Sequence, residues 1–224
     1  MLELEERMKR YENSFQFYLP QRIPLIIRID GRAFHTFARK CEKPWDQELS
    51  EAFVKTAQKL IEEIQGAKLA YGFSDEISIL ITDYDRLESQ PWFGKNLNKI
   101  VSVSASIATA EFNHVYNRST ATFDSRTFII PKEDVCNYFV WRQQDAIRNS
   151  INALGQFHFS HKQLQNLSCG QIKEKLLIEK NIDWNRLDFW KKWGWCVTKE
   201  TVDNNIPLFT EYRNYIDKFV LIGE

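Results

Sequence analysis

The sequence predicts an α+β fold in which an antiparallel sheet carries helices on one face and is followed by a C-terminal extension. Two observations lead to this prediction. The 224-residue chain is 43% apolar and 27% charged, near the average of globular domains apart from an excess of aromatic residues. Strand-like and helix-like segments follow one another in the order β-α-ββ-α-β-α, close to the split βαβ plan of ferredoxin-like domains.

The first two elements are a helix and a buried strand. Residues 2–17 alternate charged and apolar side chains at helical spacing, and Pro20 ends that helix. Residues 23–29 form a run rich in isoleucine. Because Asp30-Gly31 follows directly, this run predicts a strand that ends in a turn.

A capped helix and a strand pair come next. Asp46 is a helix N-cap, and Gly66 closes the helix near residue 65. Residues 68–82 have the pattern of a strand, a turn and a second strand, with the bend at or near Ser74-Asp75-Glu76.

The last elements of the core are a helix over residues 96–116, a strand over 120–131 and a helix over 133–154. Small residues between 102 and 108 would let the first of these helices approach the sheet closely. After Gly155 the composition shifts to lysine and tryptophan. We therefore expect a core over residues 1–155 and an extension over 156–224, helical with short strands and packed on the core.

Charge and cysteine usage bound the class of protein. Thirty basic groups balance thirty acidic ones, so a basic excess gives no argument for a nucleic-acid partner. Locally, residues 44–90 carry a net −6 and residues 140–200 a net +4. Four scattered cysteines without zinc spacing indicate a reduced compartment. With no apolar run long enough for a bilayer, we expect a cytoplasmic protein without a membrane partner.

Two short strings carry candidate chemistry. Asp30 lies in R-I-D-G-R-A-F-H (28–35), where an apolar strand ends, and Asp75 lies in G-F-S-D-E (72–76), at the bend after another. Each string alone is also compatible with an ordinary turn.

Together the two strings suggest a metal site. In a β-α-ββ arrangement the end of the first strand and the neighbouring bend lie side by side. Asp30, the Gly31 carbonyl and Asp75 could then bind two Mg²⁺ ions, with Glu76 nearby. Such a pair of ions supports phosphoryl transfer. This layout is that of a polymerase or nucleotide-cyclase palm.

Five strings then resemble one family. They are R-I-D-G-R-A-F-H (28–35), K-P-W-D (43–46), Y-G-F-S-D-E-I-S (71–78), F-D-S-R (123–126) and W-R-Q-Q-D (141–145). They are similar to motifs of the tRNA(His) guanylyltransferase family and, within it, of the Thg1-like branch of 3′→5′ polymerases. The resemblance implies a palm-like core and an enzyme that adds nucleotides to the 5′ end of tRNA.

The resemblance also implies a role for the matching residues. Asp30, the Gly31 carbonyl and Asp75 would bind both Mg²⁺ ions, and Glu76 would support them as a third catalytic residue. The implied nucleotide-binding residues are Arg28, Gly31, Arg32, Ala33, Phe34, His35, Lys43, Ser74, Asp75 and Lys99. The W-R-Q-Q-D string and its neighbour would position RNA: Trp141, Arg142, Gln143, Gln144, Asp145 and Asn149.

The reaction implied by the resemblance has two stages. ATP first activates a 5′-monophosphate end of tRNA, giving an adenylylated end and pyrophosphate. The 3′-hydroxyl of an incoming nucleotide, usually GTP with other nucleoside triphosphates possible, then attacks that end and expels AMP. The family also implies a homotetramer built as a dimer of dimers.

The sequence departs from the family pattern after W-R-Q-Q-D. Enzymes strict for tRNA(His) usually carry H-I-N-N, whereas this chain has Ile147 at the histidine position and keeps only Asn149 of that string. We therefore expect repair of 5′-truncated tRNAs rather than strict reading of tRNA(His) identity. Two alternatives stay open: a nucleotide cyclase, suggested by the G-F-S-D-E bend, and a non-catalytic RNA-binding module that kept the palm.

Overall fold

A computed structural model of the chain describes residues 3–221. Its helices and strands, in chain order, are α1 (Leu4–Asn13), β1 (Leu25–Gly31), α2 (Phe34–Phe37), α3 (Gln47–Glu63), β2 (Ala67–Phe73), β3 (Glu76–Ile81), α4 (Leu97–Val115), β4 (Phe123–Ile129), α5 (Lys132–His158), α6 (His161–Leu164), α7 (Cys169–Lys180), α8 (Phe189–Trp193), β5 (Trp195–Val197), β6 (Val202–Asp203) and α9 (Asn214–Asp217). Short 3₁₀ turns lie at Ala38–Lys40, Trp92–Lys95 and Trp184–Arg186.

The sheet has six strands in the order β4-β1-β3-β2-β5-β6, and neighbouring strands run antiparallel. Each core helix and strand that the sequence predicts is present within a few residues of its expected bounds. The predicted N-cap is also present, because Asp46 Oδ1 accepts a hydrogen bond from the Leu49 amide at 2.9 Å. The predicted α+β class is therefore confirmed.

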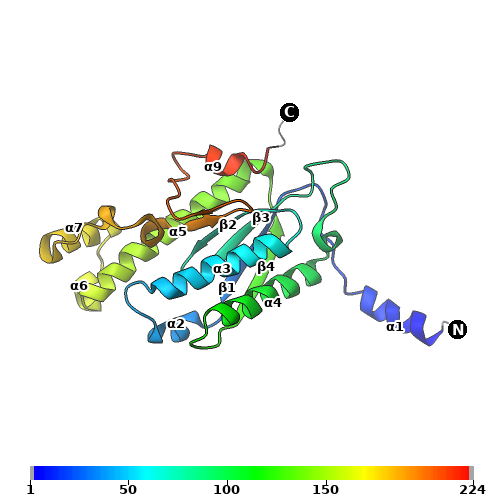
Figure 1. Cartoon of the computed structure of the whole chain (residues 1–224), viewed down its shortest axis with the longest axis horizontal. Coiled ribbons are helices and arrows are strands. Elements are labelled where there is room, and N and C mark those ends of the chain that lie inside the picture. Colours follow the sequence, from blue (N-terminus) through cyan, green and yellow to red (C-terminus); the bar gives the residue numbers. More distant parts are fainter. Residues whose placement is uncertain (1–2, 222–224) are drawn as a thin grey trace.

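The prediction that the helices share one face of the sheet is wrong. Alternate residues of β1 point to opposite faces, and each face receives buried apolar side chains from this strand. Ile27 and its neighbours on that face pack with α3 and α4, whereas Ile26 packs with residues of α5 and α9 on the other face. Figure 1 shows the sheet between these two layers. α5 and the C-terminal extension therefore cover the face of the sheet that α3 and α4 leave open.

The extension continues the sheet. β5 pairs with β2, with Trp195 opposite Gly72, and its indole packs directly on that glycine. α5 runs without a break through residue 155, where the sequence predicts a boundary. Around the end of α5, a third apolar cluster joins α5, α7 and the buried Trp184, whose indole donates to Ser150 Oγ at 2.9 Å. The division into core and extension stays a prediction.

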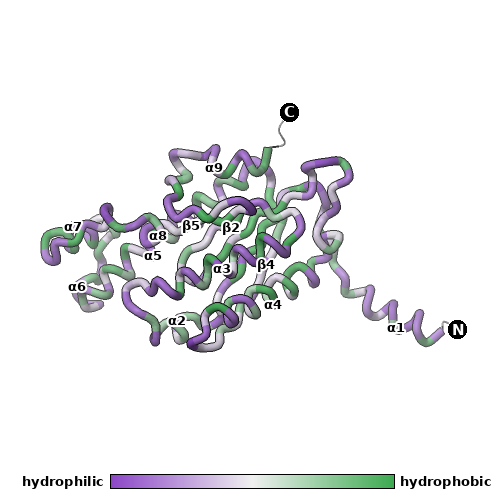
Figure 2. Tube along the Cα trace, in the orientation of Figure 1, coloured by the Kyte–Doolittle hydropathy of each residue, from purple (hydrophilic) through white to green (hydrophobic). Residues whose placement is uncertain are grey.

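α1 projects away from the body of the molecule (Figure 1), and Figure 2 shows it as predominantly hydrophilic, in contrast to the central strands. Within the described residues, no helix combines the length and the apolarity that a membrane crossing needs. The cytoplasmic location stays a prediction.

Candidate active site

A cavity of about 730 Å³ opens at the end of the sheet where β1 finishes. Its wall is built from α2 and the loop after it, the bend between β2 and β3, the middle of α5, and Trp190 and Trp195 of the extension. Among the residues with predicted roles, those lining the cavity are Asp30, Phe34, His35, Lys43, Ser74, Asp75, Glu76, Arg142, Asp145 and Asn149. Four of the five motifs therefore converge on one cavity.

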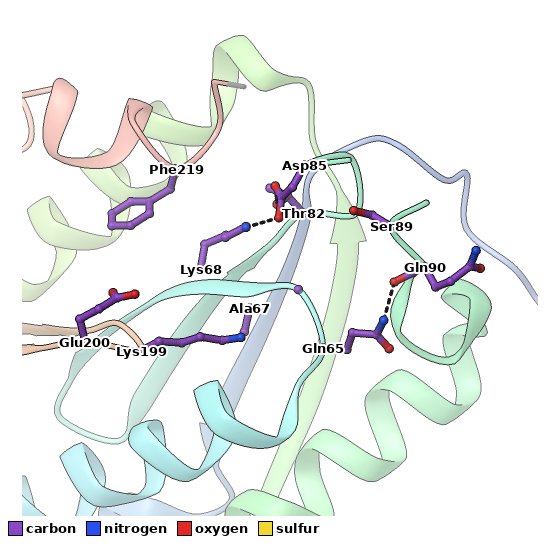
Figure 3. Close-up of a pocket in the computed structure, with 11 residues that line it drawn as sticks. Gln65, Ala67, Lys68, Thr82, Asp85, Ser89, Gln90, Lys199, Glu200 and Phe219 are labelled. Carbon is purple, nitrogen blue, oxygen red and sulfur yellow. Dashed lines mark hydrogen bonds and ion pairs between the residues drawn. The ribbon is translucent and has the colours of Figure 1, made fainter. Parts of the chain in front are cut away.

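A second cavity, of about 430 Å³, lies at the opposite end of β2 and β3 (Figure 3). From Glu76 to Thr82, β3 spans about 20 Å, at roughly 3.3 Å per residue. In this cavity Lys68 forms an ion pair with Asp85, and Asp85 also accepts a hydrogen bond from Thr82. Because the charges of Lys68 and Asp85 neutralise one another, this cavity offers little to a charged substrate.

The two predicted metal-binding carboxylates lie on adjacent segments. Asp30 pairs with Glu76 across β1 and β3. The Gly31 amide donates to the Asp75 carbonyl at 3.1 Å, which ties the end of β1 to the bend. Ser74 holds that bend with a left-handed φ of 55°, and its hydroxyl donates to Asp75 Oδ1 at 3.0 Å. The sequence-based expectation that strand end and bend lie side by side is confirmed.

Asp75 forms no ion pair with the residues that the structure describes. Burial raises its pKa to about 6, with further increases from Asp30 and Glu76, against which the Ser74 hydrogen bond acts. A carboxylate with a raised pKa at the mouth of a cavity favours the binding of a cation.

Glu76, in contrast, is already paired. Arg142 of α5 donates to its two oxygens at 2.7 and 2.8 Å, a bidentate contact between side chains that are only 12% and 18% exposed. Arg28 lies 3.9 Å away, and Ser78 donates to Glu76 at 3.3 Å. Glu76 therefore links the bend between β2 and β3 to α5 rather than offering oxygens to a metal.

The turn after β1 explains why glycine follows Asp30. A Cβ at Gly31 would lie 2.5 Å from Cδ2 of Phe34, whose ring is buried among Phe37, Phe53, Phe112 and Phe123. Ala33 adopts a left-handed φ of 52° and starts α2. Phe34 thus lines the cavity while its ring packs within the core.

The other predicted nucleotide-binding residues divide into two groups. The side chains of His35 and Lys43 are exposed and line the cavity. Arg32 and Ala33 are exposed on the turn beside the cavity, and the Arg32 amide donates to the Thr122 carbonyl at 2.9 Å.

Lys99 lies elsewhere. The Phe123 amide donates to Thr109 Oγ1 at 3.2 Å, and Phe123 pairs with Gly31, so Thr109 marks the level of the site on α4. Lys99 is ten residues earlier on the helix, about 15 Å away at 1.5 Å per residue, where its ammonium lies over Phe93. Lys99, which the resemblance places among the nucleotide-binding residues, is therefore not part of the cavity wall that the structure describes.

The W-R-Q-Q-D string also divides. Gln143 is buried, donates to the Pro207 carbonyl at 2.9 Å and accepts from the Phe209 amide at 2.8 Å, so it anchors the extension. Trp141 is 52% exposed, with the Arg142 guanidinium over its ring, and Gln144 is exposed. Asp145 accepts hydrogen bonds from three side chains of α5: Arg142, Arg148 and Asn149.

Sequence reasoning missed two features of the site. Arg126 of the F-D-S-R string lies 3.8 Å from Asp30, although its string was recognised without a role for any residue. Trp190 and Trp195 line the cavity. The clustering of tryptophan in the extension was a signal for them, but only the β2–β5 pairing brings them to β2.

The residues present fit a magnesium site of few carboxylates. Among residues 3–221, no three His, Cys, Asp or Glu side chains are grouped as a metal cage. Asp75, with its raised pKa, Asp30 beside it and the Gly31 backbone supply hard oxygen donors only. Mg²⁺ in phosphoryl-transfer sites typically takes one or two carboxylates and completes its shell with water and substrate phosphates. Asp30, Gly31 and Asp75 therefore suit Mg²⁺ better than a softer metal.

Comparisons with known proteins point to one family. A sequence model of the family described as tRNAHis guanylyltransferase matches residues 5–131, more than half of the chain. A solved structure of a bacterial tRNA(His) guanylyltransferase (Thg1)-like protein in complex with ATP has 52% identity and a TM-score of 0.94, covering 97% of this chain and 99% of that one. A bacterial Thg1-like protein in complex with GTP has 46% identity and a TM-score of 0.88, covering 97% and 98%.

A curated relative extends the comparison to eukaryotes. The tRNA(His) guanylyltransferase 2 of Arabidopsis thaliana is 32% identical over 157 residues. The match covers 63% of this chain and 28% of the plant protein, so the chain corresponds to only part of that protein.

Proposed function

Because the chain belongs to the tRNA(His) guanylyltransferase family of nucleotidyltransferases, we propose that it is a 3′→5′ nucleotidyltransferase. Its substrates are the 5′ end of tRNA, ATP and GTP, and its cofactors are two Mg²⁺ ions. The observation that carries the proposal is the juxtaposition of Asp30, Gly31 and Asp75 at one end of a cavity large enough for a nucleotide.

The proposed nucleotide site combines cationic groups for the phosphates with an apolar wall for the base. We assign Asp30, the Gly31 carbonyl and Asp75 to the two Mg²⁺ ions, which when bound would neutralise charge on the reacting phosphates. Lys43 and Ser74 border the cavity beside Asp75 and would hold the phosphate chain. Trp45 and Trp190 line the same cavity and offer apolar surface to a base. ATP and GTP are the ligands named for the two bacterial relatives.

The reaction proceeds in two displacements. In the first, an oxygen of the RNA 5′-monophosphate attacks the α-phosphorus of ATP, and pyrophosphate leaves. In the second, the 3′-hydroxyl of GTP attacks the 5′-phosphorus of the RNA, the bond to the adenylate breaks, and AMP leaves. The side chains contribute positioning and charge rather than a covalent intermediate.

RNA would approach along α5. Trp141, Gln144 and Asn149 are exposed on this helix, and Asn149 reaches the cavity wall. Because Ile147 replaces the histidine of the H-I-N-N string, we propose that the physiological substrates include 5′-truncated tRNAs. This preference distinguishes template-dependent repair from addition of a single guanosine to tRNA(His).

The test is nucleotide addition by the purified protein. With Mg²⁺, ATP, GTP and a tRNA lacking a first guanosine opposite a templating cytidine, the expected product is the full-length tRNA. Asp30→Asn and Asp75→Asn should abolish extension while Arg118→Ala, an exposed arginine paired with Glu48, should retain it. Failure of the folded protein to extend both truncated tRNAs and tRNA(His) would contradict the proposal. A cyclic product from GTP alone would show a cyclase instead.

We further propose a homotetramer built as a dimer of dimers. α1 exposes an apolar stripe: Leu4 and Tyr11 are 66% and 64% exposed, and Met8 is 43% exposed. Among the described residues the helix has no buried side chain, so a second copy is needed to cover this stripe. Light scattering should give four times the chain mass, and Leu4→Glu with Tyr11→Glu should reduce it; a monomer in the unmodified protein would contradict the assembly.

A further inference from the structure

An exposed tryptophan on α5 lies next to the proposed metal site but outside the nucleotide cavity. Trp141 is 52% exposed, although tryptophan is on average highly buried. The next residue, Arg142, donates to both oxygens of Glu76 at the bend between β2 and β3. Arg142 lines the cavity, whereas the part of the lining that the structure describes does not include Trp141. The indole is therefore close to the site without forming a wall of the cavity.

Neighbouring side chains hold this ring and leave one face open. The Arg142 guanidinium lies over the Trp141 ring, 4.4 Å from its centroid. Tyr138 contacts the ring in a T-shaped arrangement, with centroids 5.9 Å apart. Tyr138 is itself buried, and its hydroxyl shares a hydrogen bond with Ser78 Oγ at 2.8 Å, which fixes it to the sheet. Because arginine covers one face and half of the indole stays exposed, the other face is available to a planar group.

A second exposed ring belongs to the same cluster. Phe128 of β4 is 36% exposed and contacts the Tyr138 ring at a centroid distance of 5.6 Å. Phe128 pairs with Ile26, which packs on the α5 face of the sheet, so both side chains project from that face. Phe128, Tyr138 and Trp141 are called the aromatic platform below. The platform joins the edge strand β4 to α5.

The platform extends away from the proposed metal ligands. The register places Asp124 opposite Asp30, and Phe128 lies four residues further along β4, about 13 Å at 3.3 Å per residue. At the other side of the platform, Trp141 adjoins the arginine that contacts the bend. Successive nucleotides of a strand rise about 3.4 Å each. A group on the platform is therefore a few nucleotides or less from a phosphate bound at the carboxylates.

The chemistry of the platform suits an unpaired nucleic-acid base. Each base has a flat π face, and aromatic side chains commonly hold single-stranded RNA by stacking on it. Gln144 is exposed one turn later on α5, where its amide can donate to and accept from the edge of a base. A recessed 5′ end leaves the opposing bases of an RNA unpaired, so the proposed substrate supplies such a group.

The area of the platform is too small for a protein partner. A fully buried aromatic side chain contributes roughly 150–250 Å², and Phe128 and Trp141 are each only partly exposed. A stable protein interface buries roughly 800 Å² on each partner. Charged side chains lie beyond the rings, because Arg126 is 51% and Arg148 63% exposed. The apolar area therefore matches one or two bases rather than a second copy of the chain.

We propose that the aromatic platform stacks an unpaired base of the RNA substrate and thereby aligns the single-stranded part of the RNA with the metal site. Trp141 contributes the open ring face, and Gln144 contacts the edge of the base. The base belongs either to the 5′ end that is extended or to the strand opposite it. The inference rests on the proposed function only in taking RNA as the substrate.

The first experiment measures RNA binding without turnover. A hairpin RNA with a recessed 5′ end and an unpaired 3′ strand is titrated into the purified protein in Mg²⁺, without ATP or GTP. Trp141→Leu keeps an apolar side chain beside Arg142 but removes the ring, and it should weaken binding about 5- to 100-fold. Trp141→Phe should retain most of the affinity. The matched control is Phe157→Ala, which removes a 53% exposed ring from the same helix and should bind as the unmodified protein does.

The second experiment identifies the strand on the platform. 2-Aminopurine, whose fluorescence falls when it stacks, replaces either the 5′-terminal base or an unpaired base of the 3′ strand. Quenching that the unmodified protein and Trp141→Phe produce, and Trp141→Leu does not, identifies the stacked position. Because stacking displaces no counterions from the phosphates, the slope of the logarithm of affinity against the logarithm of salt concentration should be equal in these three proteins.

The platform is overturned if Trp141→Leu binds within twofold of the unmodified protein and quenches both labelled RNAs equally well. It is also overturned if the loss of affinity comes with a smaller mass in light scattering, because Trp141 would then lie at a contact between copies. Failure of the proposed function has a different signature. If the unmodified protein stacks the RNA through Trp141 but extends no end, the platform stands and the reaction is wrong.

Discussion

Replacement of Arg142 by leucine tests whether the Glu76–Arg142 pair holds the bend between β2 and β3 against α5. The substitution removes both hydrogen bonds to Glu76, at 2.7 and 2.8 Å, and one to Asp145 at 3.0 Å. Glu76 would then remain 18% exposed with Arg28 3.9 Å away as its nearest cation. We expect the free energy of unfolding to fall and the bend that carries Asp75 to loosen.

The magnitude follows from burial. Removing one partner of a fully buried ion pair costs about 3–5 kcal/mol, because the other charge stays desolvated. Here both side chains keep some exposure, and Arg28 and Ser78 still face Glu76. These residual contacts reduce the expected loss to about 2–3 kcal/mol.

The assay is urea unfolding of the metal-free protein, with Arg148→Ala as the matched control. Arg148 contacts the same Asp145 but is 63% exposed, so its removal should cost about 0.5 kcal/mol or less. In a double-mutant cycle with Glu76→Gln, the coupling energy with Arg142 should be about 2 kcal/mol. The reasoning is refuted if Arg142→Leu unfolds within about 0.5 kcal/mol of the unmodified protein, or if the coupling is absent.

Three further predictions concern single positions. The folded-state pKa of Asp75 is raised from 3.8 to about 6, so the folded protein takes up a proton before the unfolded chain does. In EDTA, the free energy of unfolding contributed by this group should therefore rise as the pH falls from about 7 to 4, and Asp75→Asn should flatten that trend in urea titrations; a slope unaffected by the substitution would contradict it. Gly31→Ala should cost about 1–3 kcal/mol of stability and weaken Mn²⁺ binding measured by electron paramagnetic resonance, because its Cβ meets the Phe34 ring. Gly170→Ala, whose added Cβ would meet only Ser168 Oγ at an ordinary contact distance of 3.8 Å, is its control and should not destabilise. Gln143→Ala should lower stability by about 2–3 kcal/mol through loss of both backbone contacts, yet leave the affinity of the folded protein for tRNA unchanged in filter binding; a selective loss of tRNA affinity would return Gln143 to the RNA-contacting residues.

The order of elements and the position of Asp30 and Asp75 could be predicted because they depend on local signals. A strand ending in Asp-Gly, a helix capped by Asp46 and a bend at Ser74 are each decided by neighbours in the chain. The side-by-side placement of the two carboxylates then follows from strand pairing alone.

The partners of the other polar residues could not be predicted, because they come from elements far apart in the sequence. Glu76 and Arg142 are 66 residues apart, and Gln143 reaches a carbonyl 64 residues later. The residues of one motif can also lie on different faces of a helix. Arg142 contacts Glu76 at the bend between β2 and β3, whereas Gln143, the next residue, is bonded to the extension. A motif therefore predicts that its residues have a role, whereas the face of the helix on which each residue lies decides which partner it contacts.

The three site carboxylates differ in how their charge is compensated, and this difference separates their roles. Glu76 forms a close ion pair with Arg142, so its charge is compensated and the pair fixes the bend between β2 and β3. In the described part of the chain, the ion pair of Asp30 is the looser, solvent-exposed contact with Arg126 at 3.8 Å, which a metal can displace. Within residues 3–221 Asp75 has no ion-pair partner, and burial raises its pKa to about 6. Cation affinity should follow the uncompensated charge, so we expect Asp75 and Asp30 to be the metal ligands and Glu76 to support them through the backbone that it shares with Asp75.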